Sequence, residues 1–274
     1  MKYLVVIICL FSMFSCTQEE AVKVESIESL NFEAKAVFDE KSEGVYKGTF
    51  TTNDSQKRGV IAIQVMADKS AYAKMVYSNG SDLILKATGD MQLSDQEILY
   101  TFSEGQVELS FQVSLNGKNP KVSGLLIANT PSFATILKET SRGAVLPVTG
   151  TYVCTECGTH PLFNGGITQT FSATTVSGAG NNNQDIVTQI LFNGNDFGSA
   201  TGNTQAGCVN SGSARVCDIS GASTAIAGRV INWTGTHSFL RGSTDCSEVE
   251  GTWTYDSVYG MLSGTFTSDS SCGI

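Results

Sequence analysis

The chain has 274 residues and a formal net charge of −9, and only 16% of its residues are charged. Globular domains typically contain about 25% charged residues. Low charge content combined with 41% hydrophobic residues excludes a protein that is disordered and acidic throughout. The negative net charge argues against a broad electrostatic contact with nucleic acid, so no nucleic-acid partner is expected.

The first 15 residues have the pattern of a signal peptide. Lys2 is followed by an apolar run over residues 3–14. This run is too short to cross a bilayer, for which a helix needs about 20 residues. One basic residue followed by such a run is typical of a secretory signal that is removed from the mature protein.

A cysteine ends the apolar run at Phe14-Ser15-Cys16. A small residue directly before a cysteine at this place resembles the lipobox of bacterial lipoproteins, with Met13 where the usual lipobox has Leu. The resemblance implies cleavage before Cys16, a diacylglyceryl thioether on its sulfur and an acylated amino group, so that palmitate is incorporated. Several acyl chains anchor a protein firmly to a membrane, whereas a single chain binds only marginally. An ordinary secretory signal with an incidental Cys16 is the alternative.

Acidic residues follow the predicted lipidation site. Thr17-Gln18-Glu19-Glu20 resembles the surface-export signal of Bacteroidota lipoproteins, although early acidic residues are also common in plain tethers. The resemblance implies a location in the cell envelope, with the protein lipid-anchored to the outer membrane and exposed at the cell surface. We predict that residues 16–43 form a lipidated acidic tether.

Residues 44–141 are predicted to form an antiparallel β domain. Polar and apolar side chains alternate without interruption over residues 106–115, so that Val107, Leu109 and Phe111 share one face of a half-buried strand. Consecutive strands joined by short turns favour a meander that is closed into a barrel or folded as a sandwich. Further strands are expected at 45–51, 59–67, 70–77, 82–88, 97–103, 121–128 and 132–139.

The composition changes near residues 142–148, which we predict to be a linker. Residues 150–274 contain no Lys, three Arg and 19 of the 28 glycines, and they are rich in Ser, Thr and Asn. A second antiparallel β domain is expected at 149–274, with long polar loops at 178–185 and 193–207. A Gly followed two places later by an aromatic residue recurs at Gly48, Gly150 and Gly251, which hints at a duplication but is also common in edge strands. The expected strands are 149–154, 167–177, 186–193, 214–219, 225–239, 249–256 and 260–267.

Six cysteines lie in this second domain, and none lies between residues 17 and 153. An even number of cysteines in an exported domain predicts disulfide bonds, although six cysteines allow 15 pairings. Proximity along the chain favours three pairs: Cys154–Cys157, Cys208–Cys217 and Cys246–Cys272.

The segment from Cys154 to His160 also has the spacing of a metal knuckle. Zinc is the alternative interpretation, with Cys154, Cys157 and His160 as ligands, because two thiolates in a C-x-x-C segment reach one tetrahedral centre. The second ligand pair of a zinc finger is missing, however. Thiol–disulfide exchange needs a helix N-terminus that lowers the pKa of the first thiol, which a β pattern does not offer. A structural disulfide is therefore expected, with neither a metal nor a cofactor.

Aromatic residues of the second domain suggest a ligand site. Trp233, Trp253, Tyr255 and Tyr259 lie near Asn and Asp, as in sugar-binding faces where rings stack on the ligand. Burial in the core is the default for such rings.

An enzyme is the alternative function for this domain. Glu248 and Glu250 share one face of a strand, as the paired carboxylates of a glycosidase do. His237 is the candidate base of a peptide-active hydrolase.

The sequence favours a non-catalytic lipoprotein of the cell envelope that binds or scaffolds a glycan or a surface protein. Two alternatives remain. The first is an envelope hydrolase that acts on glycan or peptide. The second is a barrel, built by residues 44–140, that carries a small apolar ligand in its interior.

Overall fold

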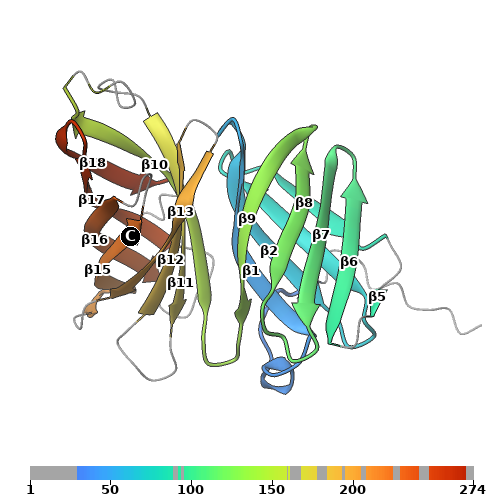
Figure 1. The fold of residues 1–274 in the computed structure, drawn as a ribbon. Coiled ribbons are helices and arrows are strands. Elements are labelled where there is room, and N and C mark those ends of the chain that lie inside the picture. The colour runs from blue at the N-terminus through green and yellow to red at the C-terminus, as the bar shows by residue number, and fades with distance from the viewer. Residues whose placement is uncertain are drawn as a thin grey trace, which may run out of the picture. The chain divides into compact units, whose positions relative to one another are not determined.

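A computed structural model describes most of the chain beyond residue 29. The described residues are 30–88, 92–93, 96–158, 160, 168–177, 184–192, 195–204, 208–224, 229–240 and 247–269. They form antiparallel β-structure, apart from a single 3₁₀ turn at Ala36–Phe38 (Figure 1). Two separate antiparallel sheets are present, so the predicted all-β fold is confirmed.

The first sheet is a meander that curls into a nearly closed barrel, called the first barrel below. Its strand order is β4-β3-β2-β1-β9-β8-β7-β6-β5, so the first long strand pairs with the last. A bridge between Ala87 and Phe102 links the two open edges, and the Thr88 N–H donates to the Thr101 carbonyl at 2.8 Å. The strands are β1 (Gly44–Thr52), β2 (Arg58–Val65), β3 (Ala71–Tyr77), β4 (Asp82–Lys86), β5 (Gln92–Leu93), β6 (Glu97–Glu104), β7 (Val107–Ser114), β8 (Lys121–Ile127) and β9 (Thr130–Glu139).

Side chains fill the interior of the first barrel. The predicted alternation of β7 is confirmed, because its odd-numbered residues from Val107 to Val113 are buried. Tyr46 packs against Phe111 with ring centroids 4.9 Å apart, and both side chains are fully enclosed. Phe50 contacts the ring of Tyr77 edge-on at 5.1 Å. Large rings from several strands thus meet in one core.

The second sheet closes on itself and is called the second barrel below. Its strand order is β13-β12-β11-β10-β18-β17-β16-β15-β14, and an additional pairing of β13 with β15 completes the ring. The strands are β10 (Val145–Glu156), β11 (Thr168–Ser177), β12 (Gln184–Phe192), β13 (Asn195–Thr204), β14 (Val209–Ser211), β15 (Ala214–Thr224), β16 (Val230–Leu240), β17 (Ser247–Ser257) and β18 (Gly260–Ser268).

Strand β13 corrects one sequence prediction. Most of the polar loop expected at 193–207 is a strand, which pairs with β12 on one side and with β15 on the other. Its residues are mainly small and polar and lack the alternation that marks a half-buried strand. Backbone pairing on both edges, rather than a hydrophobic pattern, defines this segment.

Two expected boundaries also move. Strand β10 begins at Val145, inside the linker predicted at 142–148, because its first residues pair with β11. Val145, Leu146 and Val148 are also buried. The end of the predicted tether packs on the first barrel. The Lys138 ammonium group donates hydrogen bonds to the carbonyls of Lys41 at 2.6 Å and Glu43 at 2.8 Å.

The two barrels share one topology. Each is a nine-strand meander in which the first strand pairs with the ninth, and the strand orders match position by position. Gly48 and Gly150 lie in the first strand of each barrel. A Cβ there would lie 1.8 Å from the Thr135 carbonyl oxygen and 2.3 Å from that of Thr267, on the ninth strand in each case. Gly251 lies in β17 and is not equivalent to them.

Residues Phe32–Ile274 form one compact unit that contains both barrels. Arg58 makes two hydrogen bonds to the Asp269 carboxylate, each at 2.6 Å, and the Thr149 hydroxyl donates to the same carboxylate at 2.7 Å. Within the described part of the chain, no helix has the length and hydrophobicity that crossing a membrane requires.

Candidate functional site

The interior of the second barrel contains an apolar cavity of about 50 Å³. The side chains that line it come from β10, β11, β12, β15, β16, β17 and β18, so the cavity is the lumen of the barrel. Aromatic rings and aliphatic side chains make up the described part of the wall, and the surface that they expose to the lumen is wholly apolar. Isolated water is a poor occupant, because a buried water needs two to four polar partners.

Two tryptophans occupy paired positions on neighbouring strands of this wall. Trp233 on β16 is paired with Trp253 on β17 in the strand register. Both rings point inward, and the side chains are only 7% and 5% exposed. They are the chain's only two tryptophans, so indole fluorescence reports on the lumen alone.

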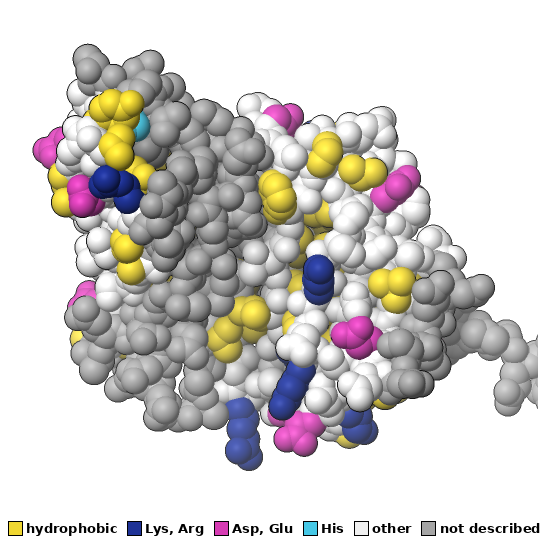
Figure 2. Space-filling model, viewed as in Figure 1, with side chains coloured by type: hydrophobic (Ala, Val, Ile, Leu, Met, Phe, Trp, Pro, Cys, Tyr) yellow, Lys and Arg dark blue, Asp and Glu magenta, His cyan; other side chains and the backbone are white. Residues whose placement is uncertain are grey.

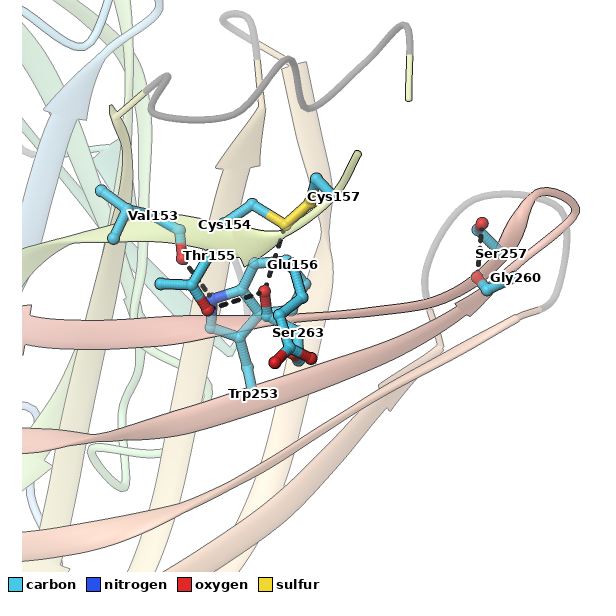
Figure 3. The surroundings of a disulfide bond; sticks show 9 residues. All are labelled: Val153, Cys154, Thr155, Glu156, Cys157, Trp253, Ser257, Gly260 and Ser263. Atoms are coloured by element: carbon cyan, nitrogen blue, oxygen red, sulfur yellow. Dashed lines mark hydrogen bonds between the residues drawn. A yellow bond between two sulfur atoms is a disulfide. The ribbon is translucent and has the colours of Figure 1, made fainter. Parts of the chain in front are cut away.

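The Trp253 ring lies over a glycine of the adjacent strand. A Cβ on Gly264 would lie 2.7 Å from both Cε2 and Nε1 of Trp253. The indole Nε1 donates a hydrogen bond to the Val153 carbonyl at 3.2 Å (Figure 3). Tyr152 packs edge-on against the same ring at 5.8 Å. The ring is thereby held against the wall of the barrel.

Trp233 has the same relation to Gly221 on β15. A Cβ on Gly221 would lie 2.0 Å from Cζ2 of Trp233. Its Nε1 is buried and has no hydrogen-bond partner among the described residues. Such a buried donor destabilises the fold by about 1–3 kcal/mol relative to a paired one. The two indoles thus lean away from each other, each toward a glycine on its far side.

Two phenylalanines repeat this arrangement. Phe171 lies over Gly150, where a Cβ would be 2.5 Å from its Cε1 atom, and Phe266 lies over Gly251 at 2.6 Å from Cζ. The two phenyl rings meet edge-on at 5.5 Å. Glycines in the strands therefore seat four of the rings that line the lumen. The glycine enrichment of residues 150–274 was the signal for this site, but the sequence analysis did not connect the glycines with the aromatic rings across the strands.

Comparison with protein families, curated proteins and solved structures found no match. The function is therefore inferred from the residues of this chain.

The predicted aromatic face is not exposed as a unit. Trp233, Trp253 and Tyr255 are buried, whereas Tyr259 is 69% exposed at the turn between β17 and β18. Stacking on a sugar needs neighbouring exposed rings. The structure instead brings the two tryptophans together inside the barrel.

The Cys154–Cys157 pair forms a disulfide at the end of β10 (Figure 3). A disulfide leaves no thiolate for zinc. The ring of the third candidate ligand, His160, packs edge-on against Tyr259 at 4.9 Å. In the described part of the chain, no group of three or more His, Cys, Asp or Glu side chains is arranged to hold a metal ion. The zinc interpretation is not supported.

The second predicted disulfide, Cys208–Cys217, is also present and links β15 to the residue that precedes β14. The third predicted pair, Cys246 and Cys272, lies outside the described residues, as does the predicted lipidation site Cys16.

The hydrolase candidates lie on opposite faces of the sheet. Glu248 and Glu250 alternate with the buried residues Ser247 and Val249, so both carboxylates point out of the barrel. His237 points inward and is fully buried, with its Nε2 2.6 Å from the Ser247 hydroxyl. Burial lowers the His237 pKa to about 4. The structure does not bring these three residues together.

The described surface shows no basic region on the face seen in Figure 2. Lys and Arg side chains are interspersed there with Asp and Glu. The lumen is therefore the candidate site, because side chains from seven strands line one cavity there.

Proposed function

We propose that this chain is a lipid-anchored, non-catalytic binding protein of the bacterial cell envelope. The observation that carries the proposal is the pairing of Cys154 with Cys157 and of Cys208 with Cys217. Disulfides form and persist in exported proteins and are rare in the reducing cytosol. Together with the lipobox-like segment that ends at Cys16, they favour a site of action beyond the inner membrane.

In this proposal the anchor and the barrels have separate tasks. Acyl chains on Cys16 hold the protein at the outer membrane, because two or more chains bind a bilayer stably. The acidic segment that follows serves as the tether, and the barrels beyond it provide the binding surface. Binding is favoured over hydrolysis because Glu248 and Glu250 face outward while His237 is enclosed.

Metabolic labelling with palmitate tests the anchor. We expect the wild-type protein to incorporate label and the Cys16→Ala variant to incorporate none. Cys9→Ala is the matched control, because Cys9 lies within the apolar run and should not be acylated. Globomycin, which blocks lipoprotein signal cleavage, should cause a larger precursor to accumulate. Equal labelling of wild type and Cys16→Ala would refute the proposal.

A carrier of small apolar ligands is the second candidate for the binding role. The sequence analysis placed the apolar ligand inside a barrel of residues 44–140. The large rings of Tyr46, Phe50 and Phe111 occupy that core. The apolar lumen of the second barrel is the observation that favours a carrier, at a different place in the chain.

A further inference from the structure

We propose that the lumen of the second barrel is a binding site for a small, wholly apolar group of two or three carbons, such as the end of an alkyl chain. This inference specifies the ligand of the proposed binding role and therefore rests on it. It assigns the site to the lumen that Trp233 and Trp253 help to line.

The first argument is the chemistry of the wall. Among the residues whose side chains the structure describes, the lining exposes only apolar atoms, including those of Ile186, Ile219 and Val249 on three different strands. A hydroxyl or charged group placed there would lose its hydrogen bonds to water and find no replacement. The described wall therefore disfavours a polar ligand atom and accepts hydrocarbon.

The second argument is that the sequence builds the vacancy. A barrel of this size can be filled by its own side chains, as the core of the first barrel is, or can hold one small ligand. In the second barrel, Gly221 and Gly264 have no Cβ atom, and Trp233 and Trp253 occupy the space that a Cβ there would take. Both rings consequently lie along the wall and leave the centre open. A simple packing defect would not require glycines opposite the rings in the interiors of strands, where glycine weakens the sheet.

The third argument is size. The cavity measures about 50 Å³ and is only partly enclosed. An apolar protein cavity of about 150 Å³ holds benzene. A space of one third that volume takes a xenon atom or the last carbons of a chain, whose remainder can extend through the open side.

Fluorine NMR on the full lipidated chain in lipid nanodiscs tests the inference. Labelling with 5-fluorotryptophan gives two resonances, because the chain has two tryptophans, and single Trp→Phe variants assign them. We expect xenon pressure to shift both resonances saturably. Pentane should do the same, whereas pentane-1,5-diol, with the same carbon chain and two hydroxyls, should bind at least tenfold more weakly.

Two matched substitutions locate the site. Ala173 lines the lumen, whereas Ala73 is buried in the first barrel. Ala173→Val should fill the cavity and weaken xenon binding at least tenfold, while Ala73→Val should leave xenon binding unchanged. Non-saturable shifts that are equal in all variants, or unaltered binding in Ala173→Val, would overturn the inference.

The two proposals fail separately. Loss of xenon binding with intact palmitate labelling at Cys16 would remove the apolar site and leave the envelope role. Saturable xenon binding in a chain that never incorporates palmitate would retain the site and remove the anchor.

Discussion

The two barrels have the same strand order but are stabilised in different ways. The first barrel closes around large rings such as Phe111 and contains a buried ion pair in which the Lys47 ammonium lies 3.0 Å from the Glu139 carboxylate. The described part of the second barrel has two disulfides and an apolar lumen. One topology can therefore support either a filled core or a vacancy, depending on where glycine and aromatic residues face each other.

Cross-links compensate for the weaker interior of the second barrel. Unfilled space removes dispersion contacts that close packing would supply, at about 24 cal/mol for each Å³ of cavity. A disulfide restricts the unfolded chain and so raises the free energy of unfolding without adding any packing. Glycine in strand interiors adds to the need for such cross-links, because it loses the most conformational freedom on folding.

The largest expected difference between the barrels concerns their ion pairs. Glu139→Ala in the first barrel should lower the free energy of unfolding by about 3–5 kcal/mol, because it leaves the Lys47 charge buried without its carboxylate. It also removes the acceptor of the Val145 N–H hydrogen bond at 3.0 Å. Arg229→Ala in the second barrel removes a solvent-exposed pair with Asp256 and should change the free energy of unfolding by less than about 1 kcal/mol.

Urea titration followed by circular dichroism measures both variants. Hydrogen exchange of peptides from β1 and β9 shows whether the loss in Glu139→Ala begins in the first barrel. Equal destabilisation by the two substitutions would contradict the interpretation of Lys47 and Glu139 as a buried charge pair.

Disulfide removal should produce the next largest effect. Replacing both Cys208 and Cys217 by Ser should destabilise the second barrel by about 2–4 kcal/mol, because the unfolded chain regains the freedom of the closed loop. Tryptophan emission reports on the second barrel specifically, since Trp233 and Trp253 both line its lumen.

The first barrel provides the internal control for this prediction. It contains no cysteine, so a reducing agent should leave hydrogen exchange in β2 and β7 unchanged while tryptophan emission changes at lower urea concentration. Parallel loss of protection in both barrels would mean that they unfold as one unit.

Acid should affect the second barrel before the first. The pKa of His237 is about 4 in the folded protein, against about 6.5 in the unfolded chain. Between these values the unfolded state binds more protons, so stability falls as the pH falls, by about 2 kcal/mol at pH 5. His237→Gln should flatten this dependence between pH 6.5 and 4.

Carboxylates of the first barrel respond at lower pH. Hydrogen bonds from the hydroxyls of Thr52 and Ser70 hold the pKa values of Asp54 and Asp68 below their ordinary values. Their contribution is lost only as the pH falls below about 4, the usual range of aspartate. Tryptophan emission and amide exchange in β2 should separate these two steps, and a single transition at pH 4 would refute the assignment to His237.

The sequence alone predicted those features that depend on residues close together along the chain. The alternation from Val107 to Val113 defines β7, because successive side chains of a strand point to opposite faces. The pairs Cys154–Cys157 and Cys208–Cys217 follow from short separations along the chain. The signal and lipobox patterns are likewise local, and they remain predictions.

Only the tertiary structure decided those features that depend on how distant strands align with one another. β13 is a strand because β12 and β15 satisfy its backbone groups from both sides, although its own residues carry no hydrophobic pattern. The lumen exists because Trp233 faces Gly221 and Trp253 faces Gly264, on strands whose alignment no local pattern encodes. A shift of one residue would turn each ring to the other face of the sheet, so pairing determines whether the same residues fill the barrel or leave it open.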